Sequence, residues 1–344
     1  MGVPLLNTPV GALVSLVGQT PMLRIGYRLD GHEGEVFAKL ESINMTGSIK
    51  DRMVVHVLDL AYRSGELRPG DTIVEASSGN TGIAFAAIGR ALGHPVRIYM
   101  PDWMSRERVC LIENFGAEIV HVSADEGGFI GSVKMAERDA GEHGHVFLPR
   151  QFENDANTGA HAASTAPEIE HQLAGYGREI DAFVAGVGTG GTVMGVHRYF
   201  SEQRGDVRVH PLEPANSPTL RTGCRMGNHR IQGISDEFIP SLLDLESLDE
   251  LVDVWDGDAI LMAQKMCGSL GLGVGISSGA NLLGAIRLAE ELGAGSTVVT
   301  VLPDSNKKYL STALCCDEPV EDRYLSPRIE LTTLGAARSC ITPD

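Results

Sequence analysis

The sequence predicts an α/β protein of two lobes, each built on a mostly parallel sheet flanked by helices. Short β-rich runs alternate with stretches long enough for helices, which is the pattern of βαβ units. This alternation occurs on both sides of a polar loop near residues 151–159. At 344 residues, the chain is also long enough to bury two cores of ordinary size.

The expected strands fall into two groups along the chain. The first group comprises residues 71–75, 96–100, 117–122 and 145–148, and the second comprises residues 181–185, 207–212, 252–255 and 297–302. These groups predict a smaller, mobile N-terminal lobe over residues 1–155, whose first segment is a candidate to pack on the other lobe, and a C-terminal lobe over residues 156–316. Residues 317–344 mix acids, prolines and small polar residues without periodicity, so we expect an appended tail.

Composition and charge exclude several classes of function. The chain has 28 Lys and Arg against 45 Asp and Glu, a formal net charge of −17, which disfavours binding to nucleic acid or anionic lipid. No apolar stretch approaches the roughly 20 residues of a membrane-spanning helix, and the N-terminus lacks a signal-peptide pattern, so we expect a cytoplasmic protein. The cysteines follow no CxxC or zinc-ligand spacing, which predicts reduced thiols and no metal site. They are Cys110, Cys224, Cys267, Cys315, Cys316 and Cys340.

One of the six lysines, Lys50, differs from the others in its sequence context. It follows a turn and capping cluster over residues 44–48 and opens an apolar helix expected over residues 53–62. On position alone, Lys50 is a solvated lysine in a first helical turn, where cations are not favoured. A lysine that forms a Schiff base must instead be partly desolvated and close to a phosphate anchor. Two glycine-rich loops favour this second interpretation.

Each of these loops follows an expected strand and opens an expected helix. Residues 75–82 read Glu-Ala-Ser-Ser-Gly-Asn-Thr-Gly and place hydroxyls and free backbone N–H groups at a helix N-terminus, as a carboxylate site requires. Ser, Asn and Gly are also ordinary cap and turn residues, so this loop alone does not specify a ligand. Residues 186–192 read Gly-Val-Gly-Thr-Gly-Gly-Thr, and their threonines and N–H groups suit a terminal phosphate.

The second loop also matches the GxGxxG pattern of dinucleotide-binding proteins. Glu213 follows at about the position of the acid that binds a ribose hydroxyl, so an NAD-binding unit is the rival hypothesis. Against it, Thr189 and Thr192 add hydroxyl donors suited to a phosphate monoester, and Glu213 precedes Pro214, where it can simply end a strand. Together with Lys50 and the first loop, these features favour the phosphate of pyridoxal phosphate.

These motifs resemble those of the fold-type II, tryptophan synthase β-like, pyridoxal-phosphate enzymes. Within that family they are closest to the cysteine synthase (O-acetylserine sulfhydrylase) and cystathionine β-synthase branch. The matching motifs occur in the family's order over about residues 13–315. They are Gly18-Gln19-Thr20-Pro21, Gly47-Ser48-Ile49-Lys50-Asp51-Arg52, residues 77–82, Gln151-Phe152 with Asn154 and Asn157, residues 186–192, Gly233-Ile234, residues 275–280, Pro303-Asp304-Ser305 and Tyr309-Leu310-Ser311-Thr312.

The resemblance implies a pyridoxal 5′-phosphate enzyme and a role for each matched residue. Lys50 would hold the cofactor as a Schiff base and move the substrate's α-proton. Asn80 would bind the ring hydroxyl and Ser305 would face the ring nitrogen. The cofactor phosphate would lie on Gly188, Thr189, Gly190, Gly191 and Thr192. The amino-acid substrate would contact Ser77, Ser78, Gly79, Thr81, Gln151 and Gly233. The resemblance also implies a homodimer.

The reaction implied is β-replacement on L-serine or an O-activated L-serine through an α-aminoacrylate intermediate. The first expectation is cysteine synthesis from O-acetylserine and sulfide. The motif around Lys50 is nearer the cystathionine β-synthase form, and Met45 and Thr46 replace the residues more usual before it. Asp236 and Glu237 stand where cysteine synthases tend to carry small neutral residues. These acids disfavour hydrosulfide and favour a nucleophile that carries an ammonium group, unless both point to solvent.

Three alternatives remain open at this point. A cystathionine β-synthase-like or specialised enzyme would use an amino-acid thiol or amine as the nucleophile. A serine/threonine dehydratase shares the fold and the lysine, and would release an oxoacid without an added nucleophile. A non-catalytic homologue would bind another protein's C-terminus in its cleft, and the intact Lys50 argues against it.

Overall fold

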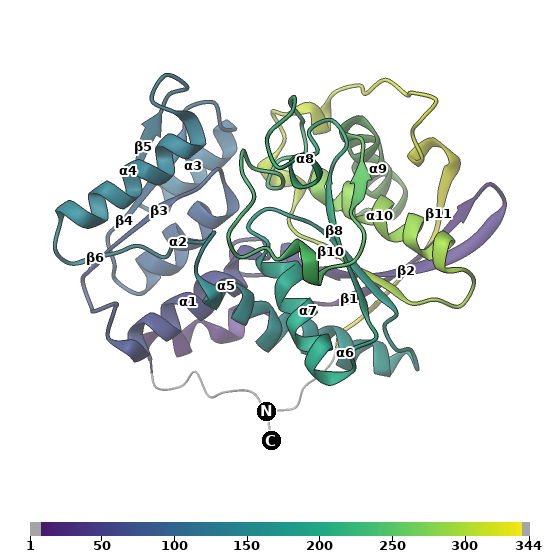
Figure 1. Cartoon of the computed structure of the whole chain (residues 1–344), viewed down its shortest axis with the longest axis horizontal. Helices are drawn as coiled ribbons and strands as arrows, with labels where there is room; N and C mark the ends of the chain where they lie inside the picture. The colour runs from purple at the N-terminus through teal and green to yellow at the C-terminus, as the bar shows by residue number, and fades with distance from the viewer. Residues whose placement is uncertain (1–7, 339–344) are drawn as a thin grey trace.

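The computed structural model describes residues 8–338, which form two sheets flanked by helices (Figure 1). One sheet has four parallel strands in the order β5-β4-β3-β6. The other has seven strands in the order β11-β1-β2-β10-β7-β8-β9, parallel from β2 to β9 with β1 and β11 antiparallel at one edge. The expected α/β class with two sheet-based lobes is confirmed.

The eight expected strands agree with β3 to β10 to within a few residues, whereas β1, β2 and β11 were not among the expected strands. In the smaller sheet they are β3 (Thr72–Ala76), β4 (Val96–Pro101), β5 (Glu118–Val122) and β6 (Val146–Phe147). In the larger sheet they are β1 (Met22–Leu29), β2 (His32–Leu40), β7 (Ala182–Gly186), β8 (Arg208–Pro214), β9 (Val252–Val254), β10 (Val298–Leu302) and β11 (Ile329–Ala337).

Ten α-helices of the described chain cover these sheets. They are α1 (Lys50–Ser64), α2 (Asn80–Ala91), α3 (Arg106–Asn114), α4 (Gly128–Glu142), α5 (Asp155–Ala160), α6 (Ala166–Gly175), α7 (Gly191–Gln203), α8 (Thr219–Thr222), α9 (Asp256–Leu270) and α10 (Ile276–Leu292). A single π-helical turn, η5 (His161–Thr165), joins α5 to α6. None of these helices is long and apolar enough to cross a membrane.

Helices pack on both faces of the larger sheet because its central strands are apolar on both faces. Along β7, Ala182 and Val184 face a core shared with α9 and α10, whereas Phe183 and Ala185 face α6 and α7. A parallel strand buried on both sides has this continuous apolar composition. Truncating a fully buried aromatic such as Phe183 to alanine costs about 3–5 kcal/mol.

The β1–β2 hairpin brings the start of the chain into the larger sheet. Its two-residue turn is Asp30-Gly31, and both residues have positive φ (48° and 91°), which Asp-Gly tolerates well. β2 then pairs in parallel with β10, so residues 22–40 belong to the sheet of the second lobe. The division of the chain at residue 155 stays a prediction.

Residues 317–338 do not form the appended tail that we expected. β11 pairs antiparallel with β1 and forms an edge of the larger sheet. Ile329 and Leu331 are buried while Glu330 and Thr332 are exposed, so a two-residue period is present. This alternation covers too few residues to be recognised in the sequence, where acids and prolines precede it. The remainder of the expected tail, residues 339–344 with Cys340, lies outside the described residues.

Candidate active site

A cavity between the two lobes brings together the lysine and both glycine-rich loops. Lys50 lines it, together with residues 77–81 of the first loop and residues 186–190 of the second. The other predicted site residues that line this cavity are Thr192, Gln151, Gly233 and Asp236. Lys50 and Gly233 therefore contribute to one site, although they are more than 180 positions apart in the sequence.

Lys50 is the first residue of α1, and its turn is attached to the end of β10. The Ile49 N–H donates to the Pro303 carbonyl at 2.9 Å, and Ser48 forms an isolated β-bridge with Asp304. Burial lowers the pKa of Lys50, and the charges of Asp236 and Asp304 oppose that shift only in part. A lysine with a lowered pKa is more readily neutral and therefore a better amine nucleophile and base.

The loop at residues 77–82 is fixed by hydrogen bonds of its side chains and of Gln151. The Ser77 hydroxyl accepts hydrogen bonds from the N–H groups of Gly79 and Gly82, at 3.1 and 2.8 Å. The Thr81 hydroxyl donates to Gln151 Oε1 at 2.6 Å, and Gln151 Nε2 donates to the Ala76 carbonyl at 2.7 Å. Gln151 is therefore fixed against this loop.

The loop at residues 186–192 has the geometry of an anion site. Its helix α7 begins at Gly191, and Gly190 has a φ of 84°, in the left-handed region that glycine adopts without strain. A Cβ on Gly188 would lie 2.6 Å from the Gly233 carbonyl oxygen, so no side chain fits there. Residues 188–190 and Thr192 line a narrow space beside Lys50, and N–H groups at this helix start fit the phosphate of pyridoxal phosphate. Gly191 does not line the cavity, and its N–H donates to the Thr189 hydroxyl at 3.3 Å.

Glu213 does not take part in this site. It is fully buried, and its Oε2 accepts from the Leu220 N–H at 2.7 Å. It is absent from the residues that line the cavity, so the GxGxxG loop here has no ribose-binding acid beside it. The NAD-binding hypothesis is therefore wrong for this loop.

Ser305 lies beside the cavity and does not line it. It caps a short 3₁₀ turn, η7 (Asn306–Lys308), by accepting from the Lys307 N–H at 3.3 Å. Another serine of a recognised motif, Ser277 of residues 275–280, does line the cavity and is 5% exposed. Ser277 lies in the first turn of α10, a position that sequence patterns alone do not distinguish from an ordinary capping serine.

The two acids of the 236–237 pair differ in their surroundings. Asp236 lines the cavity with Lys50, and burial raises its pKa to about 6, although Lys50 opposes the shift. Glu237 lies in the adjoining mouth of the cavity, where it forms an ion pair with Arg225. Asp236 is therefore close to the reacting centre, whereas the charge of Glu237 is neutralised by a neighbouring arginine.

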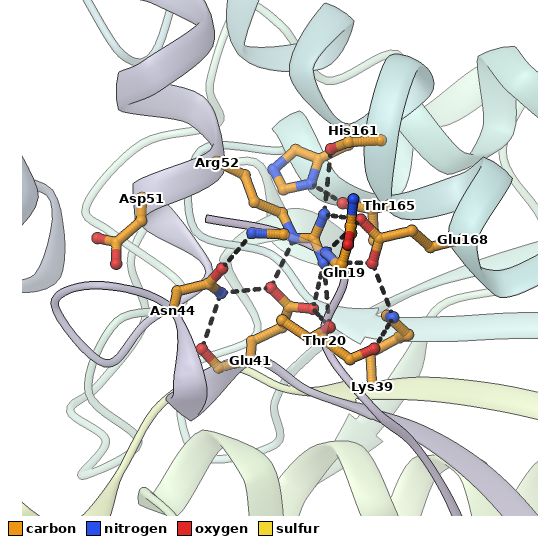
Figure 2. Close-up of polar contacts among 12 residues, drawn as sticks. Gln19, Thr20, Lys39, Glu41, Asn44, Asp51, Arg52, His161, Thr165 and Glu168 are labelled. Atoms are coloured by element: carbon orange, nitrogen blue, oxygen red, sulfur yellow. Dashed lines mark hydrogen bonds and ion pairs between the residues drawn. The ribbon is translucent and has the colours of Figure 1, made fainter. Parts of the chain in front are cut away.

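A buried ionic cluster around Arg52 was not expected from the sequence (Figure 2). Arg52 pairs with Glu41 at 2.7 Å and with Glu168 at 2.7 Å, and Lys39 pairs with Glu168 at 2.8 Å. All four side chains are at most 8% exposed. Although burial alone would raise it, the charge of Arg52 holds the pKa of Glu41 at about 2. Because Glu41 follows β2 and Glu168 lies on α6, the cluster attaches the first turn of α1 to the larger lobe.

Comparison with known proteins identifies the class to which this fold and site belong. The family model of pyridoxal-phosphate dependent enzymes matches residues 13–304, so the chain belongs to that family. Pyridoxal phosphate is its cofactor. Lys50, residues 186–190 and Thr192 line one cavity.

The particular relatives are enzymes of cysteine and β-substituted alanine chemistry. A cysteine synthase of Staphylococcus aureus is 41% identical over 306 residues, covering 89% of this chain and 97% of that protein. A hydrogen sulfide-producing enzyme from Fusobacterium nucleatum is 52% identical with a TM-score of 0.93, covering 96% of this chain and 99% of that one. O-ureido-L-serine synthase is 37% identical with a TM-score of 0.82, covering 93% and 98%. This chain is therefore a pyridoxal-phosphate-dependent β-replacement enzyme of the cysteine synthase type, acting on an amino acid and a small nucleophile.

Proposed function

We propose that the enzyme adds sulfide to the β-carbon of a serine-like amino acid or releases sulfide from it. Asp236 would accept a proton from the incoming hydrogen sulfide and return it when sulfide leaves. In one direction the enzyme would make cysteine from O-acetylserine and sulfide. In the other it would release hydrogen sulfide from cysteine. The observation that carries this proposal is the position of the Asp236 carboxylate in the lining of the same cavity as Lys50. Burial there raises the pKa of Asp236 to about 6, which suits a group that both accepts and returns a proton.

The remaining roles follow from the positions of the cavity residues. Bound pyridoxal phosphate supplies an electron sink that stabilises negative charge at the substrate's α-carbon. Lys50 would hold the cofactor and, once released from it, accept the α-proton, as its lowered pKa favours. The N–H groups of residues 188–192 would hold the phosphate, and the loop at residues 77–81 with Gln151 would hold the substrate carboxylate.

Two further assignments concern the cofactor ring. Asn80 lines the cavity and would bind the ring hydroxyl. We assign the contact with the ring nitrogen to Ser277 in place of Ser305, since Ser277 is the one of these two serines that lines the cavity. A hydroxyl partner leaves this nitrogen largely unprotonated, which favours elimination of a β-substituent over reactions that need a stronger electron sink.

Because Asp236 carries a carboxylate, the charge of the nucleophile determines how readily it enters the cavity and reacts. An ionised carboxylate in the cavity repels hydrosulfide but accepts a proton from a neutral nucleophile as it attacks the β-carbon. Neutral hydrogen sulfide is abundant near neutral pH, so it can fill this role. By microscopic reversibility, protonated Asp236 gives the proton back when sulfide leaves. This second direction agrees with the name of the relative that is 52% identical.

The test compares Asp236→Asn with wild type on purified holoenzyme in both directions. General acid–base catalysis contributes on the order of 10²–10⁴-fold. We therefore expect Asp236→Asn to lose at least about 100-fold in sulfide addition and in sulfide release, while acetate release from O-acetylserine changes little. Glu237→Gln is the matched control and should retain both rates. Equal rates for Asp236→Asn and wild type in both directions would refute the role of Asp236.

A second candidate nucleophile is an amino-acid thiol or amine. The Glu237 carboxylate at the mouth favours an approaching ammonium group, although Arg225 neutralises much of that effect. Competition between sulfide and amine-bearing thiols on the same holoenzyme decides between the two candidates.

We also propose a homodimer located in the cytoplasm. The free, exposed thiols of the described cysteines support a reducing compartment. Light scattering of the purified holoenzyme tests the dimer, and cell fractionation tests the location.

A further inference from the structure

Lys308 is a buried cation that the roles above do not use. It is 3% exposed, and it lies on the loop that follows β10. Its neighbour Lys307 is exposed, so the two adjacent lysines have opposite environments. Burial lowers the pKa of Lys308, whereas the nearby carboxylates of Asp304 and Asp51 favour its charged form, and Arg108 disfavours it.

The contacts of Lys308 lead to the cofactor-binding candidate Asn80. Lys308 Nζ donates to Asn80 Oδ1 at 2.8 Å and lies 3.3 Å from the Gly47 carbonyl oxygen. At the other end of the same amide, Asn80 Nδ2 donates to Asp304 Oδ2 at 2.7 Å. Asp304 is itself fully buried and accepts a hydrogen bond from the Tyr309 hydroxyl.

Two charges therefore fix the orientation of one amide. If the Asn80 amide turned over, its NH₂ group would face the Lys308 ammonium and its oxygen would face the Asp304 carboxylate. Both contacts would be repulsive, and both groups are shielded from water, where such repulsion is strong. An asparagine without such neighbours could present either end to a ligand.

We propose that Lys308 is a positioning residue that holds Asn80 in the one orientation in which its NH₂ group can serve the cofactor's ring oxygen. This inference rests on the proposed role of Asn80. Lys308 does not line the cavity, so it acts through Asn80. Its positive charge, one side chain removed from the ring oxygen, also favours the form of the cofactor in which that oxygen is ionised.

The alternative is a structural role in which Lys308 only neutralises Asp304 and Asp51. A structural lysine would change the stability of the protein without cofactor, and it would leave the spectrum of the bound cofactor unaltered. The positioning role would instead change the cofactor affinity. It would also change the position of the proton that the cofactor's ring oxygen and its lysine-bound nitrogen share. That proton determines the ratio of the near-ultraviolet and visible absorbance bands of the holoenzyme.

The experiment uses Lys308→Met, Lys308→Arg and the matched control Lys307→Met. For Lys308→Met we expect the dissociation constant of the cofactor to rise about 10-fold in equilibrium dialysis, which corresponds to about 1.4 kcal/mol. The reason is the loss of the charged hydrogen bond that fixes Asn80. The visible band should also lose intensity to the near-ultraviolet band. Lys308→Arg should recover most of both properties, and Lys307→Met should match wild type.

Two results would overturn the proposal. One is wild-type cofactor affinity and band ratio in Lys308→Met. The other is a combination of three results: the Met and Arg variants lose cofactor affinity equally, the band ratio is unchanged, and the apoprotein melts at a lower temperature. That combination would identify a structural role for Lys308. Failure of the proposed function is separate, since it appears as unchanged sulfur chemistry in Asp236→Asn.

Discussion

Glu75 provides a quantitative test of the electrostatics next to the loop at residues 77–82. It is the last residue but one of β3, is 3% exposed, and accepts from the Ala76 N–H at 2.9 Å and the Gln151 N–H at 3.3 Å. Burial raises the pKa of this carboxyl from 4.5 to about 8, against the smaller opposing effect of these hydrogen bonds. The folded protein therefore keeps Glu75 protonated near neutral pH.

The consequence for stability follows from linkage. Between pH 4.5 and about 8 the unfolded chain has released this proton while the folded chain retains it. The contribution of Glu75 is thus fully present below about pH 4.5 and is lost as the pH rises toward 8. The slope is at most about 1.4 kcal/mol per pH unit, or about 3 kcal/mol between about pH 5.5 and about pH 7.5.

Glu75→Gln resembles the protonated carboxyl but does not titrate. Relative to wild type, the variant should gain stability steadily between about pH 5.5 and about pH 7.5, by up to about 3 kcal/mol. The free energy of unfolding is measured on the holoenzyme by urea denaturation followed by tryptophan fluorescence. Glu113→Gln, at an exposed position on α3, controls for the loss of one charge. A constant stability difference between Glu75→Gln and wild type across this range would refute the reasoning.

Three further variants test other parts of the site. Gly188→Ala should abolish phosphate binding, since its Cβ would lie 2.6 Å from the Gly233 carbonyl oxygen; cofactor content after purification measures this. Arg52→Met leaves the buried Glu41 carboxylate without an ion-pair partner, while Glu168 keeps Lys39, and should cost about 3–5 kcal/mol in thermal or urea unfolding. A loss below about 1 kcal/mol would show that the cluster does not stabilise the fold. Glu107→Gln removes charge from a contact between the lobes, where Glu107 accepts from the Ser311 N–H and hydroxyl at 2.9 and 2.7 Å. It should raise the KM for the amino-acid substrate by a few-fold with little change in kcat, and an unchanged KM would show that this contact does not assist closure.

Local motifs predicted the parts of the site that depend on neighbours in sequence. Lys50 and the loops at residues 77–82 and 186–192 each combine a strand end, a turn and a helix start, and these features occupy consecutive residues. Backbone N–H groups at a helix start are available whatever the rest of the fold does. The motifs therefore indicated the cavity before its shape was known.

The missed features depend on contacts between distant segments. Arg52 meets Glu168 across 116 positions, and nothing in either local sequence pairs them. Lys308 is buried and Lys307 is exposed although both follow the same turn, because only Lys308 faces Asn80. Ser277 and Ser305 come from two recognised motifs, and the choice between them required the cavity lining.

The helix that carries Lys50 belongs to both lobes. Its first turn is attached to the larger lobe through Arg52 and the Ile49–Pro303 hydrogen bond, while Val54 and Leu58 pack in the core of the smaller lobe. A rotation of the lobes displaces each atom in proportion to its distance from the axis. An axis through the start of α1 would leave Lys50 almost still while the loop at residues 77–82 moves through a wide arc. The enzyme could then open and close on its substrate while the residue that we propose as the attachment point of the cofactor stays at the pivot.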